Sequence, residues 1–528
     1  MRLPRQRRRD NRRRQYEAEK TAGAFRLRAW VVAGFVVMGF AVVSLRLLTL
    51  GLIPYGEAET AGRMAAFSPF GRGDIVDARG ELLATTLKVH SLFADPANVL
   101  DVERVAQKLP TVIDISAHDV RQKLSRNSRF VWLKRGLTPT EVYAVNALGL
   151  PGLGFRQEDR RLYPQKNIAS HLVGTTNYDG QGISGIEGGY EEALASGHTI
   201  ELTVDMRLQR ALHDALKRAM VRTSAKGAWG ITLDAHTAEV KAMVSLPDYD
   251  ANAYGKASPA AWLNKNISGV YEMGSTFKMF TLAMAKQELN MQMSEEIDCT
   301  KPITIGKFRI RDSHPKAKWL RAREVFAYSS NIGAAQIADR MGAEIQQSYF
   351  GKLGLLDPLD VGLLTSVSPL YPETNRWKRI ATMAMAYGHG IAITPMQMIA
   401  AARATTIDGT WRQPIFIKGQ KTRPQQQVFT PQTVKSMREL LADVVTYGTG
   451  SQAAVYGYKV GGKTGTSEKS IAGGYAKDKH IASFFGVMPL DNPRFVTLIM
   501  VDEADGGVSG GGVVAAPLLL ILQNKPPL

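Results

Sequence analysis

The chain has 528 residues, 45% of them hydrophobic, so it has room for a membrane element and two or three folded domains and does not have the composition of a disordered protein. Its net charge of +18 would suit a nucleic-acid binder, but residues 1–28 alone hold eleven Lys and Arg against three Asp and Glu, or +8. No helix-turn-helix or zinc pattern follows this tail, so we expect no nucleic-acid partner and interpret the charge as belonging to a tail and not to a folded face. The single cysteine, Cys299, excludes an intrachain disulfide, and the nine scattered histidines offer no ligand pair, so we expect no metal and no cofactor.

A long apolar run follows the basic tail. Residues 29–45 carry no charge, and the apolar character continues beyond Arg46. Because a spanning helix needs roughly 17 to 25 residues, we expect a membrane anchor over residues 29–50. The preceding positive charges would keep the N-terminus in the cytoplasm and place the rest of the chain outside it. A cleaved signal peptide is the alternative, although its apolar core is typically shorter, roughly 7 to 15 residues.

The segment of residues 56–222 predicts a mixed domain without a catalytic cluster. Glycine-bounded strand patterns occupy residues 71–86, and helical periodicity appears in residues 101–110 and 138–149. An amphipathic helix with Asp205 as its N-cap follows and marks the border of this segment.

Residues 223–528 predict a domain built on one sheet. Residues 228–247 have the pattern of a strand, a short turn and a second strand, which opens an antiparallel sheet. A long helical stretch follows, and then come three β-rich runs at residues 458–469, 480–489 and 494–503. Strands at both ends with helices between them predict one sheet assembled from distant segments and covered by a helical insert. The apolar residues 513–523 are too few to span a membrane and predict a helix packed on that sheet.

Ser275 and Lys278 are polar residues in the otherwise apolar stretch of residues 271–280. At a spacing of three they lie about one turn apart on one helix face, so their side chains can touch. Gly274 allows a sharp turn into the helix, whose N-terminus favours negative charge on the serine oxygen. Burial and nearby cations would drive the lysine amine towards neutrality, where it can accept the serine proton. Alone, however, this pattern is common and non-specific.

A second motif, Ser329-Ser330-Asn331, precedes a helical run. The Ser329 hydroxyl can relay a proton, and the Asn331 amide can hold a lysine or a peptide group. The simpler interpretation of Ser329 is a helix cap.

A third motif, Lys463-Thr464-Gly465-Thr466, begins a strand. It offers a fixed cation, two hydroxyls on one strand face, and a glycine that would let a ligand approach the backbone. One cation and two hydroxyls suit a carboxylate, whereas the simpler interpretation of Lys463 is a charged strand edge.

These three motifs, in this order and in these elements, resemble the catalytic set of the penicillin-binding proteins and serine β-lactamases. The resemblance covers about residues 70–517 and includes "RGDIVDARGELLA", "GISGIEGGYEEAL" and "YGHGIAITPMQMIAA". It is closest to class B penicillin-binding proteins, and among them to the cell-division transpeptidase that crosslinks septal peptidoglycan. The implied fold is of the α/β class (α+β type), with a central antiparallel sheet, a helical subdomain, a preceding mixed α+β pedestal domain and one transmembrane helix.

The resemblance also implies roles for the motif residues. Ser275 would attack the carbonyl between the two terminal D-alanines of a stem peptide, with Lys278 as the base. Ser329 would protonate the leaving D-alanine, and Asn331 would orient Lys278 and the peptide. An acceptor amine would then resolve the acyl-enzyme, and β-lactams would acylate Ser275 and remain there.

The third motif would bind the substrate in this scheme. Lys463, Thr464, Gly465 and Thr466 would hold the terminal carboxylate, and the backbone N–H groups of Ser275 and Thr466 would form the oxyanion hole.

The chain departs from the family pattern at two places. Ala238 stands where the hairpin turn usually carries glycine, and residues 508–517 lack the tyrosines often found there. Glu373, two residues before Asn375, is similar to the deacylating carboxylate of class A β-lactamases, but its spacing does not match and we expect a loop.

The expected setting is the inner (plasma) membrane, crossed once, with a periplasmic catalytic domain. The implied partners are peptidoglycan stem peptides, β-lactam inhibitors, the membrane, a polytopic glycan polymerase and other division proteins. Three alternatives stay open: an elongation-type class B transpeptidase, a DD-carboxypeptidase or β-lactamase, and a non-enzymatic β-lactam receptor.

Overall fold

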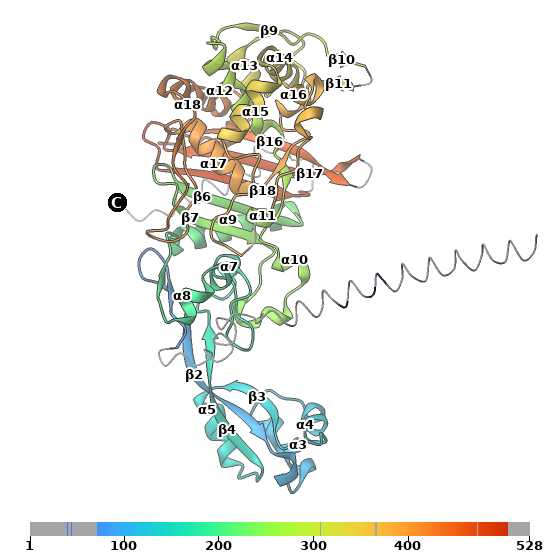
Figure 1. Ribbon diagram of the computed structural model, residues 1–528, viewed down its shortest axis with the longest axis vertical. Helices are drawn as coiled ribbons and strands as arrows, with labels where there is room; N and C mark the ends of the chain where they lie inside the picture. Colours follow the sequence, from blue (N-terminus) through green and yellow to red (C-terminus); the bar gives the residue numbers. More distant parts are fainter. Residues whose placement is uncertain are drawn as a thin grey trace, which may run out of the picture. The chain divides into compact units, whose positions relative to one another are not determined.

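The computed structural model describes residues 71–504, except 307, 365–366 and 472–473, together with the single positions 38, 40 and 44. Apart from those three positions, the expected basic tail, the membrane anchor, the start of the pedestal at residue 56 and the C-terminal helix lie outside the described residues. No helix within the described residues is both long and apolar enough to cross a membrane. All elements discussed below belong to one compact unit, Ser68–Leu528 (Figure 1).

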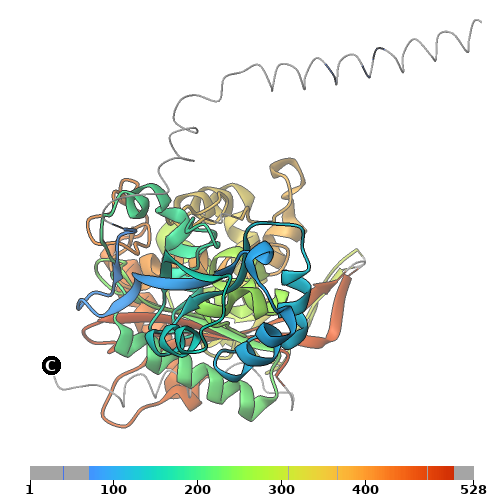
Figure 2. The same ribbon diagram turned by 90° about the horizontal axis from the view of Figure 1, so that it is seen from below.

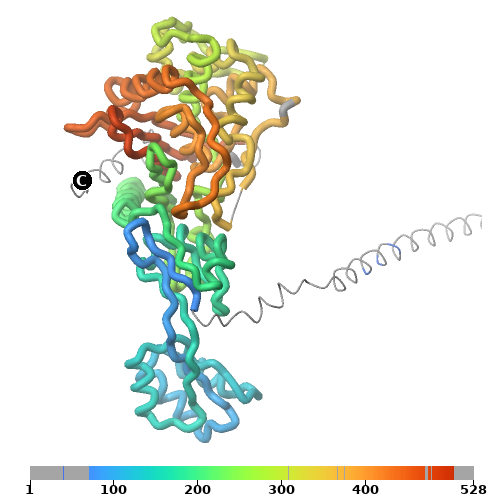
Figure 3. The backbone as a smooth tube through the Cα atoms, turned by 60° about the vertical axis from the view of Figure 1, so that its left-hand side comes forward, coloured from blue at the N-terminus to red at the C-terminus, as the bar shows by residue number. Residues whose placement is uncertain are grey.

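The N-terminal part of this unit is a five-stranded sheet with short helices. Its longest strand, β2, pairs antiparallel with β1, β3 and β4, and β1 pairs parallel with β5. Figure 3 shows the β2 and β4 segments running side by side. The strands are β1 (Ile75–Val76), β2 (Leu82–Ala94), β3 (Val131–Leu137), β4 (Leu153–Leu162) and β5 (Ile200–Glu201).

Short helices accompany this sheet, and two of them, α3 and α5, lie where the sequence pattern predicts helices. α5 begins with a capping box, in which Thr138 and Glu141 satisfy each other's backbone N–H groups. Val105, Val120 and Val145 pack with strand residues in one buried cluster. The helices are α3 (Val102–Lys108), α4 (Ala117–Leu124), α5 (Pro139–Ala147), α6 (Ser170–Val173), α7 (Gly185–Gly189) and α8 (Glu191–Ala195).

The predicted border helix is α9 (Met206–Thr223), and the Asp205 carboxylate caps it by accepting a hydrogen bond from the backbone N–H of Arg207 at 2.9 Å. Beyond α9 the distant strands form one antiparallel sheet, as predicted. Their order across the sheet is β16 (Gly461–Ile471), β17 (Gly474–Met488), β18 (Phe495–Asp502), β6 (Gly227–Asp234) and β7 (Val240–Leu246).

Alternate residues of these strands point to opposite faces of the sheet. Ala228 packs with Leu212 and Leu216 of α9, whereas Trp229 and Ile231 belong to the larger core on the other face. Figure 2 shows α9 on one side of the sheet and the helices of the insert on the other. The sheet is therefore the middle layer of three, and its inner strands are buried on both faces.

The helical insert packs on the face of the sheet opposite α9. Every residue of α17 is buried, so this helix is the centre of the larger core. The main helices are α12 (Lys278–Glu288), α13 (Ala322–Ala327), α14 (Asn331–Met341), α15 (Ala343–Lys352), α16 (Arg379–Met385), α17 (Pro395–Thr406) and α18 (Pro431–Thr446).

The turn between β6 and β7 carries the departure from the family pattern. Ala238 is fully buried and has φ +63°, a left-handed conformation that favours glycine. The alanine is therefore held there against its own backbone preference by the surrounding contacts.

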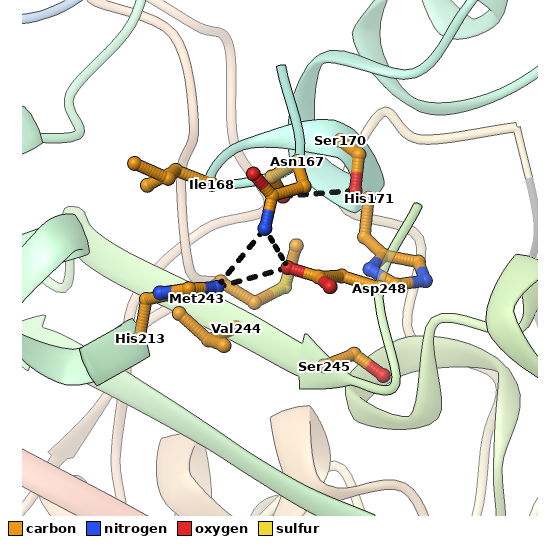
Figure 4. Close-up of a pocket in the computed structure, with 9 residues that line it drawn as sticks. All are labelled: Asn167, Ile168, Ser170, His171, His213, Met243, Val244, Ser245 and Asp248. Atoms are coloured by element: carbon orange, nitrogen blue, oxygen red, sulfur yellow. Dashed lines mark hydrogen bonds and ion pairs between the residues drawn. The ribbon is translucent and has the colours of Figure 1, made fainter. Parts of the chain in front are cut away.

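A titratable cluster lies between α6, α9 and β7. Figure 4 shows Asn167, His213 and Asp248 converging in a small cavity that His171 also lines. His213 Nε2 is 2.9 Å from Asp248 Oδ2, and its Nδ1 is 3.1 Å from Asp214 Oδ1. Burial lowers the pKa of His213, but the two carboxylates outweigh it and hold that pKa above its usual value.

A raised pKa in the folded state makes protonated His213 stabilising. The contribution is present below the pKa of an unfolded histidine, about 6.5, and is lost as the pH rises through the folded-state pKa. We therefore expect His213→Gln to flatten the fall in the urea midpoint between about pH 6 and about pH 8. The exposed His118→Gln serves as the control, and a slope unchanged by His213→Gln would contradict this assignment.

Candidate active site

The candidate nucleophile lies in a tight turn before a buried helix. Ser275 belongs to a 3-10 turn, η4 (Gly274–Phe277), and α12 begins at Lys278. Gly274 has φ +54°, and a Cβ there would lie 2.4 Å from the backbone oxygen of Thr466. Only glycine satisfies both constraints, so the turn can pack directly against β16.

The Lys278 amine is the centre of the site. Its Nζ lies 2.7 Å from Ser275 Oγ, 2.7 Å from Asn331 Oδ1 and 3.0 Å from the backbone oxygen of Ser329. A neutral amine can donate to the two carbonyl-type oxygens and accept the hydroxyl hydrogen of Ser275. The structure therefore confirms that the serine and lysine of the first motif are in contact.

The charge environment favours this neutral form. Lys278 is fully buried, and burial, followed by the positive charge of Lys463, lowers its pKa well below the usual value, while Asp312 acts in the opposite direction. Burial also lowers the pKa of Lys463, to about 7. The Lys463 Nζ donates to Ser329 Oγ at 3.0 Å and to the backbone oxygen of Thr464 at 2.9 Å.

Ser329 thus lies between the two lysines. Its Oγ is 3.2 Å from Lys278 Nζ as well as 3.0 Å from Lys463 Nζ, and its backbone has φ +64°. The helix-cap interpretation of Ser329 is wrong, because the cap of α14 is Ser330, whose Oγ accepts from the backbone N–H of Gly333.

Asp312 anchors this motif and was not selected from the sequence. Its buried carboxylate accepts hydrogen bonds from the backbone N–H groups of Asn331, at 2.6 Å, and Ile332, at 2.9 Å, and from Ser330 Oγ at 2.7 Å. The sequence does not single out Asp312, because it is one aspartate in a polar loop and its hydrogen-bond partners lie about twenty residues further along the chain.

The third motif begins β16 as predicted, and the structure shows a packing reason for Gly465 that the sequence did not indicate. A Cβ on Gly465 would lie 2.3 Å from Ser483 Oγ and 2.9 Å from the backbone oxygen of Met273. The glycine therefore lets β16 pack against the turn of the nucleophile, and its close approach is to the chain itself. Thr464 is buried with its hydroxyl 2.8 Å from that of Thr449, whereas Thr466 is exposed.

Four further residues that sequence reasoning missed form a chain of contacts that begins beside Lys278. The Tyr387 ring centroid lies 5.9 Å from Lys278 Nζ and 5.1 Å from the ring of His389. Glu272 accepts a hydrogen bond from the Tyr475 hydroxyl at 2.8 Å. These residues come from three separate segments, so no spacing in the sequence indicates that they meet.

Glu373 lies in a loop, as expected. It is exposed and 3.8 Å from Arg376, with which it forms a surface ion pair. Glu373 is thus part of a surface ion pair, and its position does not support a role as a deacylating carboxylate.

A serine hydroxyl in contact with a buried lysine whose pKa is well below its usual value is an arrangement that can activate a serine for acyl transfer. Residues 230–522 match the penicillin-binding protein transpeptidase domain, and residues 68–205 match the penicillin-binding protein dimerisation domain. The chain belongs to the penicillin-binding protein family, in the class B group that combines these two domains. The resemblance read from the motifs is therefore confirmed.

Two relatives show the extent of the likeness. The chain is 35% identical over 514 residues to the probable peptidoglycan D,D-transpeptidase FtsI of Caulobacter vibrioides, covering 93% of this chain and 86% of that protein. It is 28% identical over 481 residues to the peptidoglycan D,D-transpeptidase FtsI of Escherichia coli, covering 85% and 82%.

A solved structure shares the fold. Penicillin-binding protein 3 of Mycobacterium tuberculosis, complexed with aztreonam, matches with a TM-score of 0.69 and 24% identity. The match covers 86% of this chain and 97% of that chain, so both domains share the fold of the solved protein.

The role of Asp312 as an anchor of the second motif can be tested by Asp312→Ala. The substitution leaves two backbone N–H groups and a hydroxyl without their acceptor, which costs about 1–3 kcal/mol for each buried group left unsatisfied. We expect labelling of Ser275 by fluorescent penicillin to slow by about tenfold or more, because Asn331 loses its position beside Lys278.

The matched control is Asp298→Ala, an exposed aspartate whose side chain accepts from Thr300. Equal labelling rates for the two variants would show that Asp312 does not position the motif.

Proposed function

We propose that this protein is a peptidoglycan D,D-transpeptidase that crosslinks stem peptides of septal peptidoglycan during cell division, through a serine acyl-enzyme. The observation that carries the proposal is the 2.7 Å contact between the fully buried Lys278 amine and the Ser275 hydroxyl. Membership of the class B family and two relatives named D,D-transpeptidase support the choice of reaction and substrate.

In the acylation step, Ser275 Oγ attacks the carbonyl between the two terminal D-alanines and its proton passes to Lys278 Nζ. The oxygen of the tetrahedral intermediate would accept hydrogen bonds from the backbone N–H groups of Ser275 and Thr466. The C–N bond then breaks, and D-alanine leaves after its nitrogen receives a proton through Ser329. The hydroxyl contacts of Ser329 with both lysines support this relay.

In the second step, an amine from another stem peptide attacks the ester carbonyl. Its proton returns through the same groups, the bond to Ser275 Oγ breaks and a crosslink forms. Asn331 holds Lys278 in place throughout by accepting its hydrogen bond. A β-lactam would follow the first step and remain on Ser275, because no leaving group departs from the site.

Lys463, Thr464 and Thr466 would hold the substrate carboxylate, with Gly465 keeping the strand against the nucleophile turn. Charge supports this assignment, since Lys463 is fully buried without a carboxylate among its hydrogen-bond partners. An anionic ligand would supply the missing opposite charge.

The setting of this activity is also a proposal. Residues 1–28 would form a cytoplasmic tail, residues 29–50 a single membrane anchor, residues 56–222 a pedestal and residues 223–528 a periplasmic transpeptidase domain. A polytopic glycan polymerase and other division proteins would be the partners. An elongation role is the second candidate, but the two relatives described above carry division-type names.

The function is tested most simply by Ser275→Ala. We expect the variant to fold normally, to lose all labelling by fluorescent penicillin and to fail to rescue septation in cells depleted of the protein. Wild-type rescue measured in parallel is the control. Retained septation with the variant would favour a non-enzymatic receptor, and rapid turnover of a β-lactam by the wild type would favour a β-lactamase.

The two lowered lysine pKa values predict a bell-shaped pH profile of kcat/KM. Activity falls on the acid side, as Lys278 gains a proton and ceases to be a base, and on the alkaline side, as Lys463 loses its charge above about pH 7. Because arginine stays protonated, Lys463→Arg should remove the alkaline limb and keep the acid limb. An alkaline limb that persists in this variant would show that another group is responsible.

A further inference from the structure

The positive charge of the chain is concentrated in two places, and the tail is only one of them. Residues 301–323 contain eight Lys and Arg and a single acidic residue, Asp312, which gives +7. With +8 in residues 1–28, the other 477 residues share only +3. The interpretation that the excess positive charge belongs to the N-terminal tail alone is therefore wrong. We call residues 301–323 the basic segment.

The basic segment forms small exposed sheets at the edge of the helical insert. β10 pairs with β11 and β12 pairs with β9, beside α13 and α14 (Figure 1). The strands are β9 (Glu296–Asp298), β10 (Ile303–Ile305), β11 (Phe308–Ile310) and β12 (Trp319–Arg321). All of its described Lys and Arg side chains are exposed, and so are Phe308, at 51%, and Trp319, at 57%.

Most of these cations are not neutralised by the protein. Arg323 pairs with Asp443 at 2.8 Å, and Lys318 is 3.8 Å from Glu324. Within the part of the chain that the structure describes, Arg309, Lys316 and Arg321 make no ion pair. A concentration of exposed like charge raises the local concentration of an oppositely charged ligand.

The basic segment is joined directly to the catalytic groups. Its Asp312 anchors the second motif, and Asn331 Nδ2 donates to the backbone oxygen of Arg311 at 3.1 Å. Lys316 Nζ lies 4.8 Å from the ring centroid of Tyr328, the residue before Ser329. An anion on this surface would therefore be next to the groups that act on the substrate.

We propose that the basic segment binds the carboxylate-bearing stem peptides of peptidoglycan strands, beyond the peptide terminus held at Ser275. This inference rests on the proposed function. Stem peptides repeat carboxylates along a strand, and several weak contacts with one polymer act together where a single one would contribute little. The Arg forks suit carboxylates, and the exposed rings of Phe308 and Trp319 offer apolar faces beside them.

The test variant removes three of the exposed cations for which the described residues supply no ion pair: Arg309→Gln, Lys316→Gln and Arg321→Gln. The matched control removes three exposed cations elsewhere: Lys88→Gln, Arg104→Gln and Lys217→Gln. Both are made in the full chain, and the probe is purified peptidoglycan sacculi in a sedimentation assay. Fluorescent penicillin labelling of Ser275 reports whether the site and fold are intact.

We expect the test variant to bind sacculi at least about fivefold more weakly than the control variant, with equal penicillin labelling in both. Wild-type binding should weaken from about 0.05 M to about 0.3 M salt, and it should be lost on sacculi whose carboxylates have been amidated. Unchanged binding by the test variant, or undiminished wild-type binding to amidated sacculi, overturns the inference.

Two further outcomes separate the sources of anionic charge and the two proposals. If the test variant loses binding to phosphatidylglycerol vesicles but keeps binding to sacculi, the surface binds lipid and the inference is overturned. If the test variant is labelled by penicillin and binds sacculi as the control variant does, only this inference is refuted. If the wild type is not labelled by penicillin, the proposed function is refuted.

Discussion

The structure of the site depends on one buried amine. An ammonium group placed where Lys278 lies would cost several kcal/mol in lost hydration, because it has no carboxylate among its hydrogen-bond partners. The protein resolves this by favouring the neutral amine, whose lone pair then faces the Ser275 hydroxyl. In the function proposed above, burial of Lys278 is therefore what would make Ser275 a nucleophile.

The surrounding fold keeps these groups together. Gly274 and Gly465 let the nucleophile turn and β16 approach to a distance that no other residue permits, and β16 is itself fixed by its pairing with β17. On the other side, Asp312 fixes the start of α14 and with it Asn331. The site is thus held between a sheet edge and a helix N-terminus, each set by contacts of its own.

Much of this could be predicted from the sequence. The alternation of β6, β7 and the C-terminal strands predicted one sheet, and the three motifs predicted that Ser275, Ser329 and Lys463 would meet. Sequence reasoning failed where the reason was a contact between distant segments. It did not predict that Ser330 is the cap of α14 or that Gly465 lets β16 pack against the Ser275 turn, and it missed Asp312. Local spacing does not report which chain segments touch.

The charge state of Lys278 at neutral pH is the most direct test of the account. Carbon-13 labelling of lysine side chains, with the Lys278 signal assigned by its loss in Lys278→Arg, gives the pKa of this amine by NMR titration. The account predicts the chemical shift of a neutral amine at pH 7 in the free protein. A Lys278 signal that titrates near the ordinary lysine value of about 10.4 would contradict it.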